Sequence, residues 1–400
     1  MNLEGTVLKP NSNVGSGGVH RFVLPGGKIT ITRITTFCPD EIGPGPTHVY
    51  LIDSDALILL DTGMPTNLAK AFFYHWRSQA MPPEVEELLP GHAEQELLEG
   101  VNLAGYAVSD IDLIVFSHGH LDHFLMAGSI LSRTKAGVSA HIEDTPGICN
   151  PWGMLNMWIS GRRKMIPTGM PLVWSPDQSG NTDALLGLDP ESMGLSVKVD
   201  QPILRDGPIN IAGSPVRGIE VKHIPGHSPG SIGLAAGDRA GKVFMCGDVL
   251  LNPITPHPDD LLVYLRTLEQ LGEREDIGLT LPAHGHWIRD LKARVAFLKD
   301  HHRNRLKLTY DACHDPRSVW DIASMGGYFD TYVDPKLFNY LAGTEALVHM
   351  ELLNMVGGLR RTHIKNQVHY FENSREPFDQ VYGRIMELVQ ENGARPIMRY

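Results

Sequence analysis

Residues 117–123 read Ser117-His-Gly-His-Leu-Asp-His123, which places three imidazoles and one carboxylate within six positions. They follow the largely apolar run 111–116, which predicts a buried strand, so the cluster should lie on the loop where that strand ends. Imidazole and carboxylate together suit zinc, iron or manganese. In that loop, His118 and His120 could face one cation while Asp122 and His123 face a second. A His-rich surface loop is the alternative, and the preceding apolar strand argues against it.

Further candidate ligands follow in three similar contexts. His227 lies in His223-Ile-Pro-Gly-His-Ser-Pro-Gly230, Asp248 ends the run 242–248, and His284 lies in Leu281-Pro-Ala-His-Gly285. Each comes after a short β-like apolar stretch, on a turn with Gly or Pro, and loops gathered at one edge of a sheet often carry function. Singly, each could be a turn or capping residue, but their joint occurrence favours a metal centre.

An alternative nucleophile, a serine, lies within the motif that contains His227. Residues 226–230 match the GxSxG string of serine hydrolases, with Ser228 as the nucleophile. That motif requires a strand, a sharp turn and a helix, and Pro229 directly after the serine fits such a helix start poorly. A turn or capping role for Ser228 is therefore favoured.

The set of motifs resembles the metallo-β-lactamase-fold hydrolase superfamily over residues 18–300, with Asp61-Thr-Gly63 after the strand 56–60 as a further match. The resemblance implies an α+β fold, a four-layer αββα sandwich, with a dinuclear metal centre between its sheets. It assigns His118, His120 and His227 to one metal. It assigns Asp122, His123 and His284 to the other, with Asp248 bridging the two. It also implies that Asp61 lies beside the site without binding metal.

This resemblance implies hydrolysis by a metal-bridging hydroxide, with Asp122 as the catalytic carboxylate that orients it and helps to move its proton. Two divalent ions are expected, with zinc as the default, while iron and manganese suit the same ligands. Asp61 could hold the ring of a ligating histidine in place.

Composition narrows the class of protein. The chain has 400 residues, with 35 Lys and Arg against 46 Asp and Glu, a net charge of −11. An acidic chain is a poor partner for nucleic acid, although a local basic patch would still allow one. Four scattered cysteines, no signal-like N-terminus and no apolar run of membrane-spanning length predict a cytoplasmic protein without a membrane partner. A homodimer is the expectation from the prevalence of dimers.

Residues 145–200 form an insert that mixes Pro and Gly with apolar and cationic side chains. We interpret it as a lid over the metal site, with an accessory packing hairpin as the alternative. The candidate substrate contacts are Trp152, Trp158, Arg162, Arg163 and, farther along the chain, His257.

The remaining pattern divides the chain near residue 300. Residues 1–17 are expected to be a loose lead-in, residues 67–107 to be helical with breaks at prolines, and residues 258–272 to form an amphipathic helix. Residues 301–400 predict three helices, a hairpin over 359–371 and a last helix. That order resembles the branch of the superfamily with a C-terminal winged-helix domain, which includes hydrolases and an endoribonuclease.

Three functions remain open at this point. The first is hydrolysis of a small acyl compound, a thioester such as an acyl-CoA, an ester or a lactone, suggested by the complete ligand set, the acidic charge and the apolar insert. The second is a metal-dependent endoribonuclease or phosphodiesterase. The third is a binding or regulatory protein that has kept a hydrolase fold, against which the intact ligand set argues.

Overall fold

The computed structural model describes residues 3–39, 45–76, 81–151, 166–171, 195–238, 241–337 and 339–391. The chain divides into two compact units. The first unit contains Met1–Met154, Gly180–Pro256 and Arg274–Leu291, and the second contains Leu155–Ser179, His257–Glu273 and Lys292–Tyr400. All candidate metal ligands belong to the first unit.

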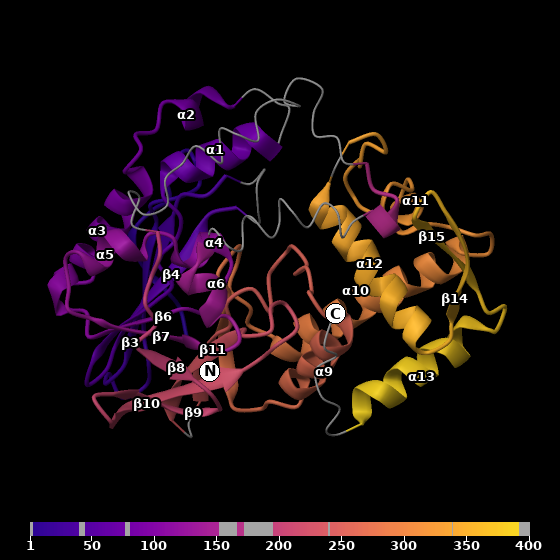
Figure 1. The fold of residues 1–400 in the computed structure, drawn as a ribbon. Helices are drawn as coiled ribbons and strands as arrows, with labels where there is room; N and C mark the ends of the chain where they lie inside the picture. Colours follow the sequence, from indigo (N-terminus) through magenta and orange to yellow (C-terminus); the bar gives the residue numbers. More distant parts are fainter. Residues whose placement is uncertain are drawn as a thin grey trace. The chain divides into compact units, whose positions relative to one another are not determined.

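Figure 1 draws the described elements as a ribbon. The first unit contains an eight-stranded sheet in which the strands lie in sequence order. Its strands are β1 (Thr6–Lys9), β2 (Val19–Val23), β3 (Thr30–Thr36), β4 (Thr47–Asp53), β5 (Leu57–Leu60), β6 (Leu113–Val115), β7 (Gly137–His141) and β8 (Gln201–Ile203). Strands β1 to β5 pair antiparallel, whereas β5 to β8 pair parallel. The expected loose lead-in is therefore wrong at residues 6–9, because their backbone pairs with β2 as an edge strand.

Parallel pairing requires crossover connections, and helices supply them. The helices within the described residues between β5 and β8 include α1 (Thr66–Trp76), α2 (Pro83–Glu86), α3 (His92–Leu103), α4 (Leu121–Phe124), α5 (Ala127–Leu131) and α6 (Thr145–Cys149), with the 3-10 turn Val108–Asp110 before β6. The predicted proline breaks in residues 67–107 are confirmed. Helix α3 packs against β3 so closely that a Cβ on Gly100 would lie 2.5 Å from Ile34.

A second, five-stranded sheet has the order β13-β12-β11-β10-β9. Its strands are β9 (Gly207–Ile211), β10 (Ser214–His223), β11 (Ile232–Asp238), β12 (Gly241–Met245) and β13 (Ile277–Leu281). Strands β12 and β13 are parallel and the other pairs are antiparallel. Strands β10, β12 and β13 therefore all end at the same edge.

The two sheets share one hydrophobic core. Phe22, Ile31 and Ile52 from the first sheet belong to the same buried cluster as Leu234 and Met245 from the second. Alternate residues of each strand point to opposite faces, so one apolar face of each sheet is covered by the other sheet. The mixed α+β fold with two sheets is thus confirmed, while the complete four-layer arrangement stays a prediction.

The second unit is mostly helical. It contains α9 (Leu261–Gly272), α10 (Leu291–Ala312), α11 (Val319–Ala323), α12 (Tyr340–Met355), the hairpin β14 (Leu359–Lys365) and β15 (Val368–Asn373), and α13 (Phe378–Gln390). Asp260 caps α9, since its carboxylate accepts a hydrogen bond from Val263 N at 3.0 Å. Three helices followed by a hairpin and a helix are confirmed here, and the winged-helix assignment stays a prediction.

The predicted domain boundary near residue 300 stays a prediction. Helix α10 runs continuously through that position, because residues 291–312 form one 22-residue helix. Helix α9 also belongs to the second unit, where Arg266 donates to Leu388 O in α13. Among the helices in the described part of the chain, none combines the length and the apolar character needed to cross a bilayer.

Candidate metal centre

The candidate ligands all follow the carboxyl ends of strands. Asp61 comes directly after β5, Ser117 and His118 follow β6, and the turn carrying His120, Asp122 and His123 leads into α4. In the second sheet, His227, Asp248 and His284 follow β10, β12 and β13. Because parallel strands end at one edge, each sheet contributes one set of loops. The amide of Ile232 donates to Ser117 O at 2.8 Å, which joins the two sets.

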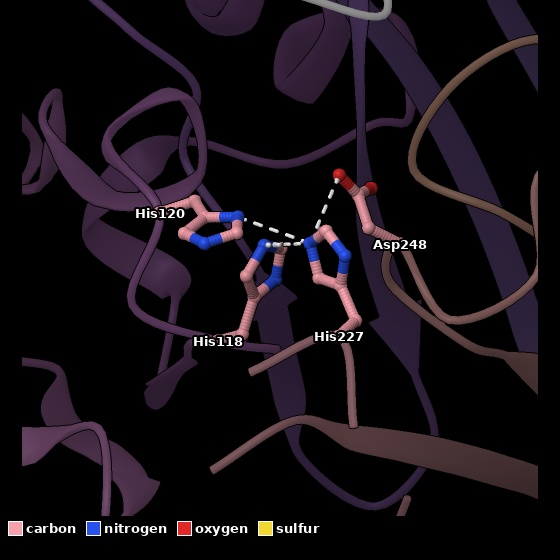
Figure 2. Close-up of side chains that lie close together, drawn as sticks. All are labelled: His118, His120, His227 and Asp248. Carbon is pink, nitrogen blue, oxygen red and sulfur yellow. Dashed lines mark hydrogen bonds and ion pairs between the residues drawn. The ribbon is translucent and has the colours of Figure 1, made fainter. Parts of the chain in front are cut away.

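One group of ligands consists of His118, His120, His227 and Asp248 (Figure 2). Each residue offers one ligand atom, and these atoms lie within 4.8 Å of one another. His227 Nε2 lies 3.2 Å from His118 Nε2 and 3.0 Å from His120 Nδ1, and Asp248 Oδ2 lies 3.7 Å from His227 Nε2. Three imidazole nitrogens and one carboxylate oxygen therefore converge on one point.

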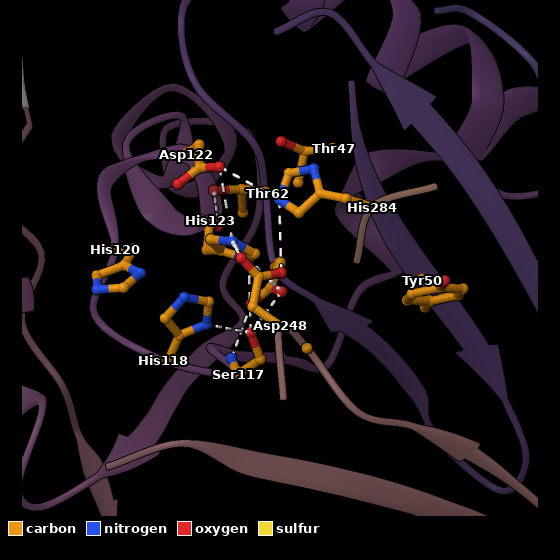
Figure 3. Close-up of polar contacts among 12 residues, drawn as sticks. Thr47, Tyr50, Thr62, Ser117, His118, His120, Asp122, His123, Asp248 and His284 are labelled. Atoms are coloured by element: carbon orange, nitrogen blue, oxygen red, sulfur yellow. Dashed lines mark hydrogen bonds and ion pairs between the residues drawn. The ribbon is translucent and has the colours of Figure 1, made fainter. Parts of the chain in front are cut away.

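The other group consists of Asp122, His123 and His284 (Figure 3). His284 Nε2 lies 3.3 Å from Asp122 Oδ2 and 3.5 Å from Asp248 Oδ1. His123 Nε2 lies 3.7 Å from Asp122 Oδ2 and 3.5 Å from Asp248 Oδ2. Asp248 thus lies between the two groups, within 3.7 Å of histidines in both.

Asp61 holds His123 and the start of the ligand loop. Its carboxylate accepts hydrogen bonds from Ser117 N and Ser117 Oγ, both at 2.7 Å, and His123 Nδ1 lies 2.9 Å from Oδ2. The side chain is fully buried, and the backbone has a φ of +63°, a left-handed conformation that Asp tolerates better than most residues. Asp61 therefore contacts the outer nitrogen of His123, a ligand candidate.

Hydrogen bonds to the outer nitrogen Nδ1 of His123 and of His284 leave the Nε2 atom of each ring directed toward the centre. His284 Nδ1 lies 3.1 Å from the carbonyl oxygens of both Gly45 and Pro46, so Nδ1 carries a proton and Nε2 faces the carboxylates of the centre. Within the described residues, the buried His123 Nε2, His284 Nε2 and Asp248 Oδ1 have no hydrogen-bond partner. Buried polar atoms without partners are costly, and a cation would satisfy all three.

The charges of the centre also fit a cation. Burial and the neighbouring imidazoles of His123 and His120 lower the pKa of His118 well below its ordinary value, which leaves the neutral form that binds metal. Burial alone would raise the pKa of Asp248, but the neighbouring His284 and His123 outweigh this effect and hold the pKa well below its usual range. Burial likewise acts to raise the pKa of Asp122, yet His123 and His284 lower it to about 2. The residues present therefore fit divalent metal ions.

Asp144 is a site residue that sequence reasoning missed. It lies just beyond β7, and its buried carboxylate accepts hydrogen bonds from Gly119 N at 2.8 Å, Ser228 Oγ at 2.6 Å and Gly230 N at 2.8 Å. It therefore ties the loop of His118 and His120 to the loop of His227. A Cβ on Gly230 would lie 2.6 Å from Asp144 Cγ, so the glycine permits this approach. The sequence offered one signal for Asp144, because it is an acidic residue that closely follows β7, the third of the parallel strands.

Replacing Asp144 with asparagine should weaken metal binding by the group that contains His227. An amide offers one acceptor oxygen, so it cannot satisfy the amides of both Gly119 and Gly230 at opposite ends of the carboxylate. Groups that orient ligands typically contribute about 10–100-fold in metal affinity, and a loss of that size is expected for an ion held by this group. Zinc titration against a competing chelator measures it.

The control for this variant is Glu143→Gln, which changes the exposed neighbouring carboxylate. It should bind both ions as the wild type does. An Asp144→Asn protein with two unaltered zinc affinities would show that the link between the loops does not position the ligands.

Ser228 does not have the setting of a catalytic serine. Its hydroxyl donates to Asp144, and Ser231 Oγ lies 2.8 Å away. The loop joins β10 to the antiparallel strand β11, so no helix follows the serine. The turn role is the one that the structure supports.

The predicted substrate contacts stay predictions. Trp152, Trp158, Arg162 and Arg163, with most of the predicted lid, lie outside the described residues. His257 belongs to the second unit, where Nδ1 lies 3.0 Å from Glu345 Oε2 and Nε2 lies 2.6 Å from Thr344 Oγ1. A role for it in substrate binding stays a prediction.

Comparison with known proteins identifies relatives by sequence. The chain is 25% identical over 334 residues to the probable metallo-hydrolase YqjP of Bacillus subtilis (strain 168), which covers 79% of this chain and 90% of the relative. It is also 25% identical over 190 residues to an N-acyl homoserine lactonase of Bacillus cereus, which covers 44% of this chain and 72% of the relative.

Solved structures share the fold. A beta-lactamase domain protein from Burkholderia ambifaria matches with a TM-score of 0.65 at 19% identity, covering 91% of this chain and 96% of that one. A metallo-beta-lactamase family protein from Thermus thermophilus matches with a TM-score of 0.63 at 18% identity, covering 88% and 99%. The model of the Metallo-beta-lactamase superfamily matches residues 42–308, which include every ligand candidate and Asp61. The chain therefore belongs to the metallo-beta-lactamase superfamily, as a metal-binding hydrolase.

Proposed function

We propose that this protein hydrolyses a small acyl compound, a lactone, ester or thioester, at a centre of two divalent metal ions. The observation that carries this proposal is the convergence of seven ligand candidates in two adjoining groups, with Asp248 between them. We assign His118, His120 and His227 to one ion, Asp122, His123 and His284 to the other, and Asp248 to both. Two such ions, when bound, make hydroxide available near neutral pH and stabilise the oxyanion that develops on the substrate.

The protein side chains have distinct tasks in this proposal. Asp122 is the most exposed member of its group, with 17% of its side chain accessible, and Oδ2 lies 3.3 Å from His284 Nε2. A carboxylate at the rim of the centre can accept a hydrogen bond from the attacking water and hold its proton as the acyl bond breaks. The low pKa of Asp122 keeps its carboxylate ionised, so that it can accept a hydrogen bond from the water. Asp61 and Asp144 hold the ligand loops.

An acyl substrate is favoured over a phosphodiester on two grounds. The similarity to an N-acyl homoserine lactonase covers 44% of the chain and supports lactones as the first class to test. The net charge of −11 works against binding a polyanion. The competing candidate, cleavage of RNA or another phosphodiester, is favoured by β14, which exposes the cations Arg360, Arg361 and Lys365.

The test is a hydrolysis screen with metal-loaded protein on lactones, acyl-CoA thioesters, simple esters, phosphodiesters and structured RNA. We expect turnover of an acyl substrate, lost on treatment with a chelator. Asp122→Asn should retain the fold but reduce kcat by about 10²–10⁴-fold, the usual contribution of general acid–base catalysis. RNA cleavage without acyl turnover would replace the proposal with the competing one.

The control variant is Asp315→Asn, which changes an exposed aspartate of the second unit. It should match the wild type in every assay. Acyl hydrolysis that persists unchanged in Asp122→Asn would show that this carboxylate does not hold the proton.

A further inference from the structure

A second group of candidate ligands lies within the helical unit. His301 and His302 are neighbours on α10, and Glu345 lies on α12. Each offers one ligand atom, and these atoms lie within 4.8 Å of one another. His302 is fully buried, Glu345 is 5% exposed, and His301 is half-buried. We call these three residues the helical cluster.

A chain of hydrogen bonds sets the proton positions in this cluster. His349 Nδ1 lies 2.7 Å from the backbone oxygen of Glu345, so Nδ1 carries the proton and Nε2 is an acceptor. His302 Nδ1 lies 3.2 Å from that acceptor and must therefore donate to it. His302 Nε2 is left with a bare electron pair.

That electron pair has no partner within the described residues. His302 Nε2 and His301 Nε2 are both buried atoms without a hydrogen bond there. Burial and the imidazole of His349 lower the pKa of His302 well below its ordinary value, and burial with Arg305 also lowers the pKa of His301. Both rings are therefore neutral and cannot satisfy these atoms by taking up a proton.

Glu345 is held in place from outside the cluster. Arg305 Nη1 lies 2.9 Å from Oε1, and His257 Nδ1 lies 3.0 Å from Oε2. Ligating carboxylates and histidines are commonly oriented by such outer partners.

We propose that His301, His302 and Glu345 bind a further divalent transition-metal ion within the helical unit. Two imidazole nitrogens and one carboxylate oxygen make a ligand set that zinc and its neighbours accept. The half-buried His301 gives solvent access to the remaining coordination position. Arg305 and His257 place cationic groups beside Glu345, so this ion binds more weakly than those of the seven-ligand centre.

Metal content at controlled free zinc tests the proposal. Wild-type protein should bind one equivalent more than His301→Gln at saturation, and a competing chelator should remove this equivalent first. The exposed His314 supplies the control, since His314→Gln should bind as many ions as the wild type. In cobalt-loaded protein, the visible absorption added with the last equivalent should be missing from His301→Gln.

The test compares the metal content of two proteins. Its outcome therefore does not depend on how many ions the seven-ligand centre holds or on the identity of any substrate. His301→Gln should keep the wild-type far-ultraviolet circular dichroism and hydrolytic rate, because only one half-buried ring changes. Equal metal content in folded wild type and folded His301→Gln would overturn the proposal. It would indicate that His302 Nε2 accepts a hydrogen bond from a bound water instead.

Discussion

Asp248→Ala should reduce acyl hydrolysis by at least about 10³-fold. Asp248 lies within 3.7 Å of histidine nitrogens from both ligand groups, so its loss removes a ligand from each ion and the negative charge between them. Metal-ion stabilisation of the transition state amounts to several kcal/mol, and each 1.36 kcal/mol corresponds to about tenfold in rate. Metal content should fall below two equivalents at zinc concentrations that saturate the wild type.

The measurement is kcat/KM for the best acyl substrate together with zinc content after dialysis. Asp315→Ala removes an exposed carboxylate and should leave both values unchanged. If Asp248→Ala kept full metal content and a rate within tenfold of the wild type, Asp248 would not lie between two ions in the working enzyme.

Asp61→Ala should weaken both metal binding and folding. The substitution leaves Ser117 N, Ser117 Oγ and His123 Nδ1 without their acceptor in a fully buried place. A buried donor left unsatisfied costs about 1–3 kcal/mol, so the free energy of unfolding should fall by at least about 2 kcal/mol. Loss of the group that orients His123 should lower metal affinity by a further ~10–100-fold.

These effects can be separated by comparing Asp61→Ala with Asp61→Asn. Asparagine keeps one acceptor oxygen, so it should be less destabilising in urea unfolding of the metal-free proteins, while metal affinity still falls. Metal-free Asp61→Ala as stable as the wild type would mean that Ser117 and His123 find other acceptors.

Most of the candidate ligands could be predicted from the sequence because each of them lies in a recognisable local pattern. A buried run, a turn and then a histidine or aspartate is visible in one window of the chain, as at Asp61, His118 and Asp248. Strand ends gather at one sheet edge, so the convergence of distant motifs could be expected as well. The helix breaks before α2 and α3 were predictable from proline for the same local reason.

Features that depend on contacts across the fold were not predictable. Nothing next to Asp144 shows that its carboxylate reaches a loop more than eighty residues away. Gly247 is another example, because the lack of space for a side chain there, where an added Cβ would lie 3.0 Å from Ser117, becomes apparent only when the loops of the two sheets meet. The assignment of α9 to the helical unit was likewise not visible in the sequence, because it depends on contacts of α9 with α12 and α13.

The origin of the ligands in two different sheets should couple the supply of metal to folding. A cation that joins loops of both sheets binds only after the sheets have come together, so its binding free energy adds to the stability of the assembled unit. At a free metal concentration about 1,000 times the dissociation constant, one such ion contributes about 4.1 kcal/mol. In a cell depleted of metal, the first consequence would be a lower amount of this protein, through unfolding and proteolysis, rather than a pool of intact but inactive enzyme.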